Sequence, residues 1–175
     1  MKTVLEIIWD GLENRKVTSL LIGGHALAAF GVARQTLDID CLMVDSDSGA
    51  IHAILTEVGY RETERTENFI RYSNSSIYLM DVDVMLVDRD TFNKMLPRSF
   101  IYQAGTIKAR VPCLVHLIAL KLHAIKNNPK RELKDLGDIV ELLRSNPGKV
   151  AREELKSTCA RYGPDGIYAK LESYL

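Results

Sequence analysis

Two aspartates interrupt an apolar stretch in the first third of the chain, Asp38 and Asp40 in LDIDCLMV. Residues i and i+2 of a strand point to the same face, with Cα atoms about 6.6 Å apart. Aspartate is depleted in strands and costly to bury without a partner. Binding of a hard divalent cation explains such a pair, because Mg²⁺ takes carboxylate oxygens as ligands. The alternative is an edge strand that turns two acids to water.

A second pair of acids, Asp81 and Asp83, lies in the later apolar run IYLMDVDVMLV. These two residues also share one strand face, so either of them can supply a third carboxylate. Three carboxylates held together without a metal repel and raise one another's pKa, which makes an empty cluster unfavourable. The alternative for Asp83 is a strand residue that faces solvent.

A double glycine, Gly23-Gly24, separates the apolar run at 17–22 from a short helix predicted at 25–31. Glycine has no Cβ, so backbone N–H groups at such a turn can approach a phosphate. His25 follows directly, and it either touches a phosphate or, as a single histidine after a turn more often does, packs and hydrogen-bonds locally.

Together these motifs resemble the polymerase-β-like nucleotidyltransferase superfamily from about residue 20 to residue 140: a double glycine, thirteen residues, Asp-x-Asp, and a later apolar strand with another acid. The resemblance implies that three carboxylates hold two Mg²⁺ ions and that the glycine turn cradles the phosphates of a nucleoside triphosphate (NTP). It gives Asp38 and Asp40 the first two metal positions. For the third it favours Asp83 over Asp81, because the unbroken apolar run VMLV follows Asp83.

The double glycine, where the wider superfamily often has Gly-Ser, resembles the AbiEii-like branch of abortive-infection toxins. That branch typically has a basic residue and a Ser or Thr shortly before Asp-x-Asp, and Arg34 and Thr36 match these positions. The resemblance implies that a guanidinium fork at Arg34 contacts the triphosphate. A surface cation is an equal alternative for Arg34.

The predicted helix at 114–126 carries Lys121 on its apolar stripe, nearly opposite the polar stripe of His116, His123 and Lys126. A lysine on the core face needs an anionic partner or a cleft to reach into. The AbiEii-like branch has a lysine in a later motif, and Lys121 resembles it. This resemblance implies that the phosphates of an NTP are the anionic partner of Lys121. The alternative is a lysine that reaches solvent past the helix end.

The next predicted helix, in KRELKDLGDIVELL, resembles the basic-Asp-x-x-Asp motif of the same branch. In those toxins the Asp after the basic residue is associated with activity, so Asp135 is the candidate that orients or deprotonates the acceptor, supported by Asp138. Lys134 belongs to a basic group that would hold the triphosphate or a tRNA end. Pairs at i,i+4, such as Arg131–Asp135, contribute only about 0.2–0.5 kcal/mol, and a solvated charged face is the alternative.

Periodicity predicts an α+β fold in which a small mixed sheet with flanking helices precedes a helical region. Residues 1–112 form the predicted nucleotidyltransferase core and 113–175 the helical C-terminal region packed on it. Residues 60–68 are predicted to be an exposed hairpin edge or loop. The predicted helices run from 3 to 14, with Thr3 as N-cap, and later over 114–126, 131–144, 149–161 and 165–174.

Composition excludes several classes of protein. The 23 basic and 23 acidic residues balance, so no overall charge favours nucleic acid or a membrane. Three distant cysteines indicate free thiols of a reducing compartment rather than disulfides. The N-terminal stretch MKTVLEIIWDGLENRK carries acids within its apolar run, so it does not have the pattern of a signal peptide. No apolar run approaches the roughly 20 residues of a membrane span, so we expect a cytoplasmic protein with no membrane partner.

The predicted function is therefore a Mg²⁺-dependent nucleotidyltransferase that moves NMP from an NTP to an acceptor and releases pyrophosphate. The predicted acceptor is a tRNA end, a partner protein or a small molecule. A further prediction is that the chain is the toxin of a toxin–antitoxin pair, with an antitoxin as partner. One alternative is a non-catalytic member of the same fold that binds a nucleotide or a partner. Another is a small α+β domain whose acids are surface residues.

Overall fold

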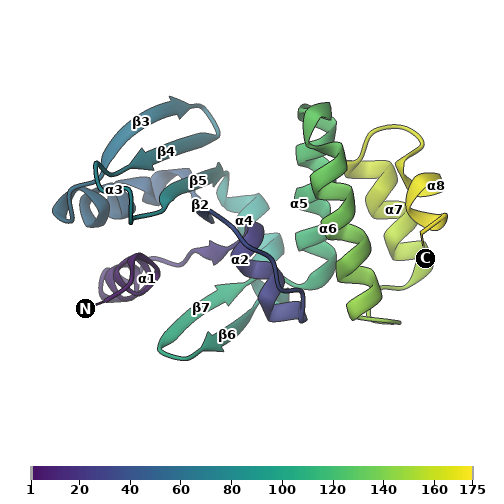
Figure 1. The fold of residues 1–175 in the computed structure, drawn as a ribbon, viewed down its shortest axis with the longest axis horizontal. Coiled ribbons are helices and arrows are strands. Elements are labelled where there is room, and N and C mark those ends of the chain that lie inside the picture. Colours follow the sequence, from purple (N-terminus) through teal and green to yellow (C-terminus); the bar gives the residue numbers. More distant parts are fainter. Residues whose placement is uncertain (1, 175) are drawn as a thin grey trace. The chain divides into compact units, whose positions relative to one another are not determined.

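The computed structural model describes residues 2–174, which form two compact units (Figure 1). The first unit contains the chain up to residue 26 together with residues 34–112, and the second contains residues 27–33 together with the chain from residue 113. Strands and helices mix in the first unit, whereas the second is helical, which confirms the predicted α+β class. Packing of residues 113–175 on the core stays a prediction.

The main sheet of the first unit has five strands in the order β1-β2-β5-β4-β3. The central strands β2 and β5 run parallel, and every other neighbouring pair runs antiparallel. The strands are β1 (Leu20–Leu21), β2 (Asp38–Val44), β3 (Arg61–Thr66), β4 (Phe69–Ser73) and β5 (Asp81–Val87). The two acid pairs predicted from the sequence therefore begin two adjacent parallel strands.

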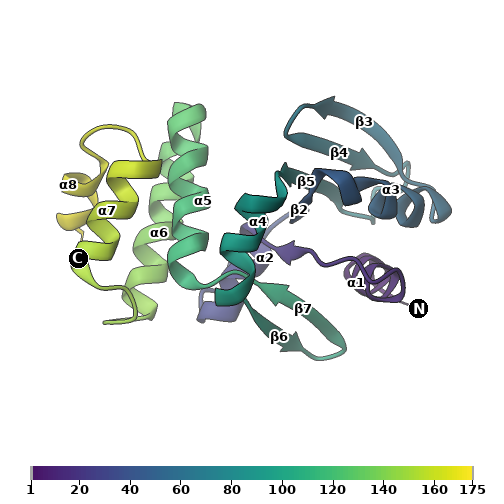
Figure 2. The same cartoon turned by 180° about the vertical axis from the view of Figure 1, so that it is seen from behind.

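Four helices and a separate two-stranded sheet complete this unit (Figure 2). They are α1 (Val4–Asn14), α2 (Gly23–Leu27), α3 (Ser48–Glu57), α4 (Arg89–Met95), β6 (Phe100–Ala104) and β7 (Ile107–Val111). The predicted cap of α1 is confirmed: Thr3 Oγ1 accepts from the Glu6 backbone N–H, and Glu6 accepts from that of Thr3. No helix within residues 2–174 combines the length and apolarity that a membrane span needs.

Alternation along β2 separates the core from the candidate site. Ile39 and Cys41 are fully buried, whereas Asp38 and Asp40, which point to the opposite face, are half-buried. Burial raises the pKa of the Cys41 thiol, with smaller contributions from Asp40 and another nearby aspartate. Cys41 is therefore a packing residue, and the other face of the strand carries the polar chemistry.

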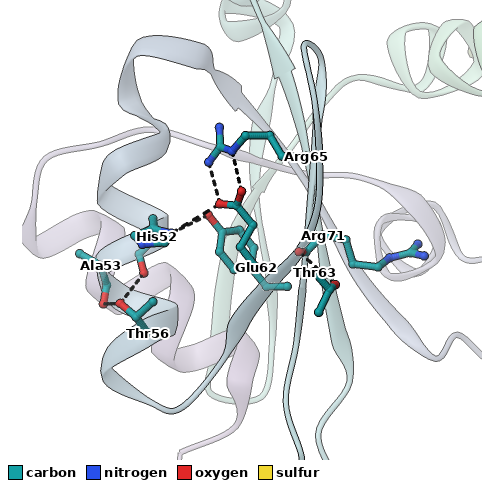
Figure 3. Close-up of polar contacts among 8 residues, drawn as sticks. His52, Ala53, Thr56, Glu62, Thr63, Arg65 and Arg71 are labelled. Atoms are coloured by element: carbon teal, nitrogen blue, oxygen red, sulfur yellow. Dashed lines mark hydrogen bonds and ion pairs between the residues drawn. The ribbon is translucent and has the colours of Figure 1, made fainter.

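The predicted exposed hairpin edge is confirmed as β3, whose residues are all exposed. On the side of α3, the Glu62 carboxylate accepts both hydrogen bonds of the Arg65 fork, at 2.7 and 2.8 Å, and lies 3.8 Å from His52 Nδ1 (Figure 3). Arg71 on β4 points away from this group, toward the other side of the hairpin (Figure 3). Polar residues thus line both sides of the edge.

One predicted strand of this unit is shorter than expected, and one strand was missed. The run at 77–87 is a strand only from Asp81, because Ile77 and Tyr78 lie in a turn with 89% of each residue exposed. The strand β6 was not predicted at all. Its residues are mostly exposed on both faces, so FIYQA carries no alternation of apolar and polar residues.

The second unit contains the four predicted helices: α5 (Leu114–Asn127), α6 (Glu132–Ser145), α7 (Arg152–Tyr162) and α8 (Ile167–Glu172). The helices α5 and α6 lie side by side (Figure 1). The early segment 27–33 joins this unit through the buried Asn146, whose Nδ2 donates to the carbonyls of Phe30 and Leu142, each at 2.9 Å.

A buried charge cluster joins α5 to α6. Lys121, 6% exposed, donates to Asp138 at 2.6 Å and to Asp135 at 3.2 Å. Arg131 donates to the other oxygen of Asp135 at 2.7 Å. Burial raises the pKa of Asp135, but the hydrogen bond from Arg131 and the charge of Lys121 outweigh it, so the pKa lies below the ordinary 3.8.

Asp135→Asn tests this cluster. Because the folded-state pKa of Asp135 is depressed, its stabilisation is present above pH 3.8 and is lost as pH falls through the folded pKa. We expect the variant to lose about 2–4 kcal/mol of unfolding free energy near pH 7, since two cations lose a buried partner. Urea denaturation down to about pH 3 should show this gap closing.

Asp165→Asn is the control, because Asp165 is an exposed acid of the same unit. It should leave the unfolding free energy at neutral pH nearly unchanged. Equal stability of the two variants at pH 7, or a gap that persists unchanged into acid, would contradict the assignment.

Candidate metal centre

Three carboxylates meet at the start of the parallel strands β2 and β5. In the register of these strands Asp38 lies beside Asp81, and Asp40 lies beside Asp83. Carboxylate oxygens of Asp38, Asp40 and Asp83 all lie within 4.8 Å of one another. The structure therefore brings together the three residues that the sequence favoured and leaves Asp81 outside the cluster.

The donor set fits a hard divalent cation. All three groups offer carboxylate oxygens, and Mg²⁺ holds such ligands at about 2.0–2.1 Å, so two ligands of one ion lie roughly 3–4.2 Å apart. The 4.8 Å envelope of the cluster is slightly wider, and small side-chain rotations close it. Asp38 and Asp40 are half-buried and Asp83 is 7% exposed, so the oxygens are partly withdrawn from water. These residues are suited to hold Mg²⁺.

A guanidinium already contacts this cluster. Arg71 lies beside Asp83 in the antiparallel register of β4 and β5, and its Nε and Nη2 donate to the two oxygens of Asp83 at 2.7 and 2.6 Å. The carboxylate in turn raises the pKa of Arg71, so the guanidinium stays charged. A carboxylate has about four lone-pair positions, so Asp83 keeps acceptor capacity for a cation beside Arg71. Arg71 offsets part of the repulsion among the three acids.

Sequence reasoning missed Arg71. It lies in FIRYS, which predicts only a short strand, and its meaning depends on β4 pairing with β5. Strand order is a long-range property, so no local pattern in the sequence could have identified Arg71 as a contact of Asp83.

The two glycines make room for the acids. Gly23 has φ of 63°, in the left-handed region, and a Cβ there would lie 1.9 Å from Oδ2 of Asp40. A Cβ on Gly24 would lie 2.7 Å from Cβ of Thr36. Both positions therefore require glycine in this structure because side chains of the site lie directly against the turn. Whether a phosphate also uses the turn stays a prediction.

Thr36 and His25 adjoin Asp38, and Arg34 lies four residues before it in the chain. Thr36 Oγ1 donates to Oδ1 of Asp38 at 2.6 Å, which orients that carboxylate. Burial lowers the pKa of His25, while the charge of Asp38 opposes the shift, and Nε2 of His25 has no hydrogen-bond partner among the described residues. Arg34 is half-buried in the segment that leads into β2. Phosphate contacts of Arg34 and Thr36 stay predictions.

The remaining predicted site residues belong to the second unit. Lys121 faces the core as predicted, and Asp135 and Asp138 supply the anionic partner that its position requires. Lys134 is exposed. The roles of Lys121 and Lys134 toward a nucleotide, and of Asp135 toward an acceptor, stay predictions. The cations around Asp135 make it a weak proton acceptor, which argues for a structural role.

Gly23→Ala tests the close approach of the turn to Asp40. The added methyl group would displace the Asp40 carboxylate, so we expect affinity for Mn²⁺ or Mg²⁺, measured by calorimetric titration, to fall by about 10- to 100-fold. Gly31→Ala is a matched control: Gly31 also has a left-handed φ, 78°, but a Cβ there would meet no residue beyond its chain neighbours within 4 Å. Equal loss of metal affinity in both variants would contradict this reading.

Arg71→Gln tests the guanidinium as a counterion of the cluster. Without metal, the variant leaves three carboxylates with less compensation, and we expect it to lose roughly 1–3 kcal/mol of unfolding free energy. The range is modest because the Arg71 side chain is 40% exposed. Mg²⁺ should raise the thermal midpoint more in this variant than in the wild type. Arg61→Gln, on the exposed strand β3, is the control and should behave as the wild type.

Comparison with known proteins assigns this arrangement to a fold. No curated protein sequence matches the chain significantly. The antibiotic-resistance factor ANT(2'')-Ia superposes with a TM-score of 0.69 at 17% identity, over 97% of this chain and 94% of that one. The lincosamide antibiotic adenylyltransferase LnuA superposes with a TM-score of 0.58 at 16% identity, over 79% of this chain and 93% of that one. An antigenic nucleotidyltransferase-like protein from Paracoccidioides brasiliensis superposes with a TM-score of 0.60 at 14% identity, over 98% of this chain and 89% of that one.

At these identities the likeness shows the fold alone, and it confirms the predicted nucleotidyltransferase fold. Membership of the AbiEii-like branch stays a prediction. The profile of a family described as uncharacterised nucleotidyltransferase matches residues 3–169, nearly the whole chain. The chain therefore belongs to this family of nucleotidyltransferases.

Proposed function

We propose that this chain transfers NMP from an NTP to a hydroxyl group of an acceptor, with Mg²⁺ as cofactor and pyrophosphate as the second product. The observation that carries the proposal is the convergence of Asp38, Asp40 and Asp83 within 4.8 Å. Family membership supports nucleotidyl transfer in general, and the hard oxygen donors support Mg²⁺ in particular.

In the proposed reaction the acceptor oxygen forms a bond to the α-phosphorus of the NTP. The bond from that phosphorus to the bridging oxygen breaks, and pyrophosphate leaves with the electron pair. Divalent cations at such a site supply charge stabilisation for the attacking and leaving oxygens. The protein would contribute mainly positioning: Asp38, Asp40 and Asp83 would hold the cations, while Thr36 orients Asp38 and Arg71 fixes the orientation of the Asp83 carboxylate.

The acceptor hydroxyl loses its proton during this step. Asp135 was predicted to accept it, but a carboxylate whose pKa is lowered by Lys121 and Arg131 binds protons weakly. We therefore propose that the proton leaves to solvent water and that Asp135 has a structural role. The Asp135→Asn variant in the transfer assay separates the two assignments, because loss of transfer in a folded Asp135→Asn protein would favour the original prediction.

A small molecule is the acceptor class to test first. ANT(2'')-Ia has been solved with adenylyl-2''-tobramycin and LnuA with lincomycin bound, and the present chain spans more than nine-tenths of both proteins. A tRNA end and a partner protein are the other predicted acceptors. A toxin role with an antitoxin partner stays a prediction.

One observation favours the non-catalytic alternative. Arg71 engages both oxygens of Asp83 in a bidentate pair, and a member of the family that no longer uses metal could retain such a pair for stability. This alternative predicts that an NTP binds without Mg²⁺-dependent transfer.

Replacement of Asp38 and Asp40 by asparagine tests the proposal. The protein is incubated with each labelled NTP, Mg²⁺ and a cell extract, and the small-molecule, RNA and protein fractions are then separated. We expect one fraction to carry label with the wild type and none with the double variant. The thermal midpoint of the metal-free double variant should stay the same or rise, because two repelling charges are removed.

Asp90→Asn, an exposed acid of the same unit, is the control and should transfer label normally. Equal labelling by the double variant would contradict the proposal. A wild-type protein that binds an NTP but labels no fraction would support the non-catalytic alternative.

A further inference from the structure

A pocket of about 430 Å³ lies away from the carboxylate cluster in the first unit. Residues from the C-terminal end of α1, from the approach to β1 and from the β6–β7 hairpin line it. Its volume is within the range of sites for small molecules. Three cations, Lys16, Lys108 and Arg110, line it together with a single acid, Glu13.

The hairpin presents two of these cations side by side. Lys108 and Arg110 are two residues apart on β7, so they share one face of that strand. Ile101, which also lines the pocket, is the register partner of Arg110 on β6. Within residues 2–174, Lys16, Lys108 and Arg110 form no ion pair, and Arg110 donates to Ser99 Oγ at 3.2 Å. The wall therefore carries positive charge that an anion can neutralise.

Lys16 takes a backbone conformation that favours glycine. Its φ is 56°, and it is the one residue other than glycine with a positive φ among those described. The hydrogen bonds from Val17 N–H to the Leu12 carbonyl and from Lys16 N–H to the Glu13 carbonyl form a Schellman motif, in which this position is usually glycine. A lysine here costs stability, and strain of this kind is concentrated at functional sites.

Two further pocket residues carry buried polar atoms without partners. Trp9 is 9% exposed and Ser19 is 4% exposed, and within the described chain neither the indole Nε1 nor the hydroxyl Oγ has a hydrogen-bond partner. Buried donors of this kind favour an acceptor. An oxygen of a bound ligand would supply the acceptor that each of these atoms lacks.

We infer that this pocket binds a small organic phosphate, whose phosphate group contacts Lys16, Lys108 and Arg110 and whose organic part borders Trp9 and Ile101. The site is separate from the candidate metal centre. Ser19 and Gly23 lie at opposite ends of the segment through β1, roughly 13 Å apart at the rise of a strand. The inference does not depend on the proposed transferase reaction, because it rests on residues outside the carboxylate cluster.

Trp9 is the single tryptophan of the chain, so its fluorescence reports on this pocket alone. The full-length protein is titrated with phenyl phosphate in EDTA, which keeps divalent cations away from the carboxylates. Phenol and inorganic phosphate are the comparison probes. We expect a saturable change in Trp9 emission with phenyl phosphate, weaker binding of inorganic phosphate, and none of phenol. Equilibrium dialysis measures the same binding without relying on the fluorophore.

Two variants remove one cation each. Lys16→Gly removes a charge and also relieves the left-handed backbone, so we expect the affinity for phenyl phosphate to fall at least about fivefold while the thermal midpoint stays or rises. Lys108→Gln should lower the affinity similarly without relieving strain. Lys94→Gln, an exposed lysine on α4 outside the pocket, is the matched control and should bind as the wild type.

Absence of saturable phenyl phosphate binding by both methods would overturn the inference. So would unchanged affinity in Lys16→Gly and Lys108→Gln, or equal binding of phenol. Inorganic phosphate that binds as tightly as phenyl phosphate would overturn the claim that the organic part is recognised. None of these outcomes bears on the transfer assay, because Asp38, Asp40 and Asp83 are intact in every variant.

Discussion

Repulsion among three carboxylates is the constraint around which the first unit is built. The backbone hydrogen bonds of β2 and β5 fix the parallel register, so Asp40 and Asp83 stay neighbours whether or not a cation is present. The strands cannot move the acids apart without loss of the sheet. Compensation comes instead from a third strand, which presents the Arg71 guanidinium to both oxygens of Asp83. The order of the strands in the sheet therefore also places a positive charge beside the three acids.

The second unit also contains neighbouring acids, but there protein cations neutralise them directly. Two acids, Asp135 and Asp138, are buried between helices, but Lys121 and Arg131 contact them directly. Buried charges that are paired and hydrogen-bonded hold one geometry, because removal of any partner leaves another uncompensated. In the second unit, protein side chains neutralise the two buried acids. In the first unit, the three carboxylates keep oxygens that suit a cation from outside the protein.

Local sequence patterns predicted the parts that depend on one element. The 3.6-residue period located the helices and placed Lys121 on a buried face, and the two-residue period placed Asp38 and Asp40 on one face of a strand. The predicted need of Lys121 for an anion was correct, but its source, α6, depends on helix packing. Arg71 and β6 were missed for related reasons. The contact of Arg71 with Asp83 depends on strand order, which local sequence does not show. The strand β6 is too exposed for apolar and polar residues to alternate along it.

The chain crosses between its two units three times, after residues 26, 33 and 112. The short excursion 27–33 is held by Asn146, more than a hundred residues later in the sequence, and it separates the glycine turn from the strand with Asp38 and Asp40. The helical unit is therefore not a detachable appendage. A chain shortened after residue 112 would leave residues 27–33 without Asn146 as their hydrogen-bond partner. We therefore expect the two units to be expressed and engineered together.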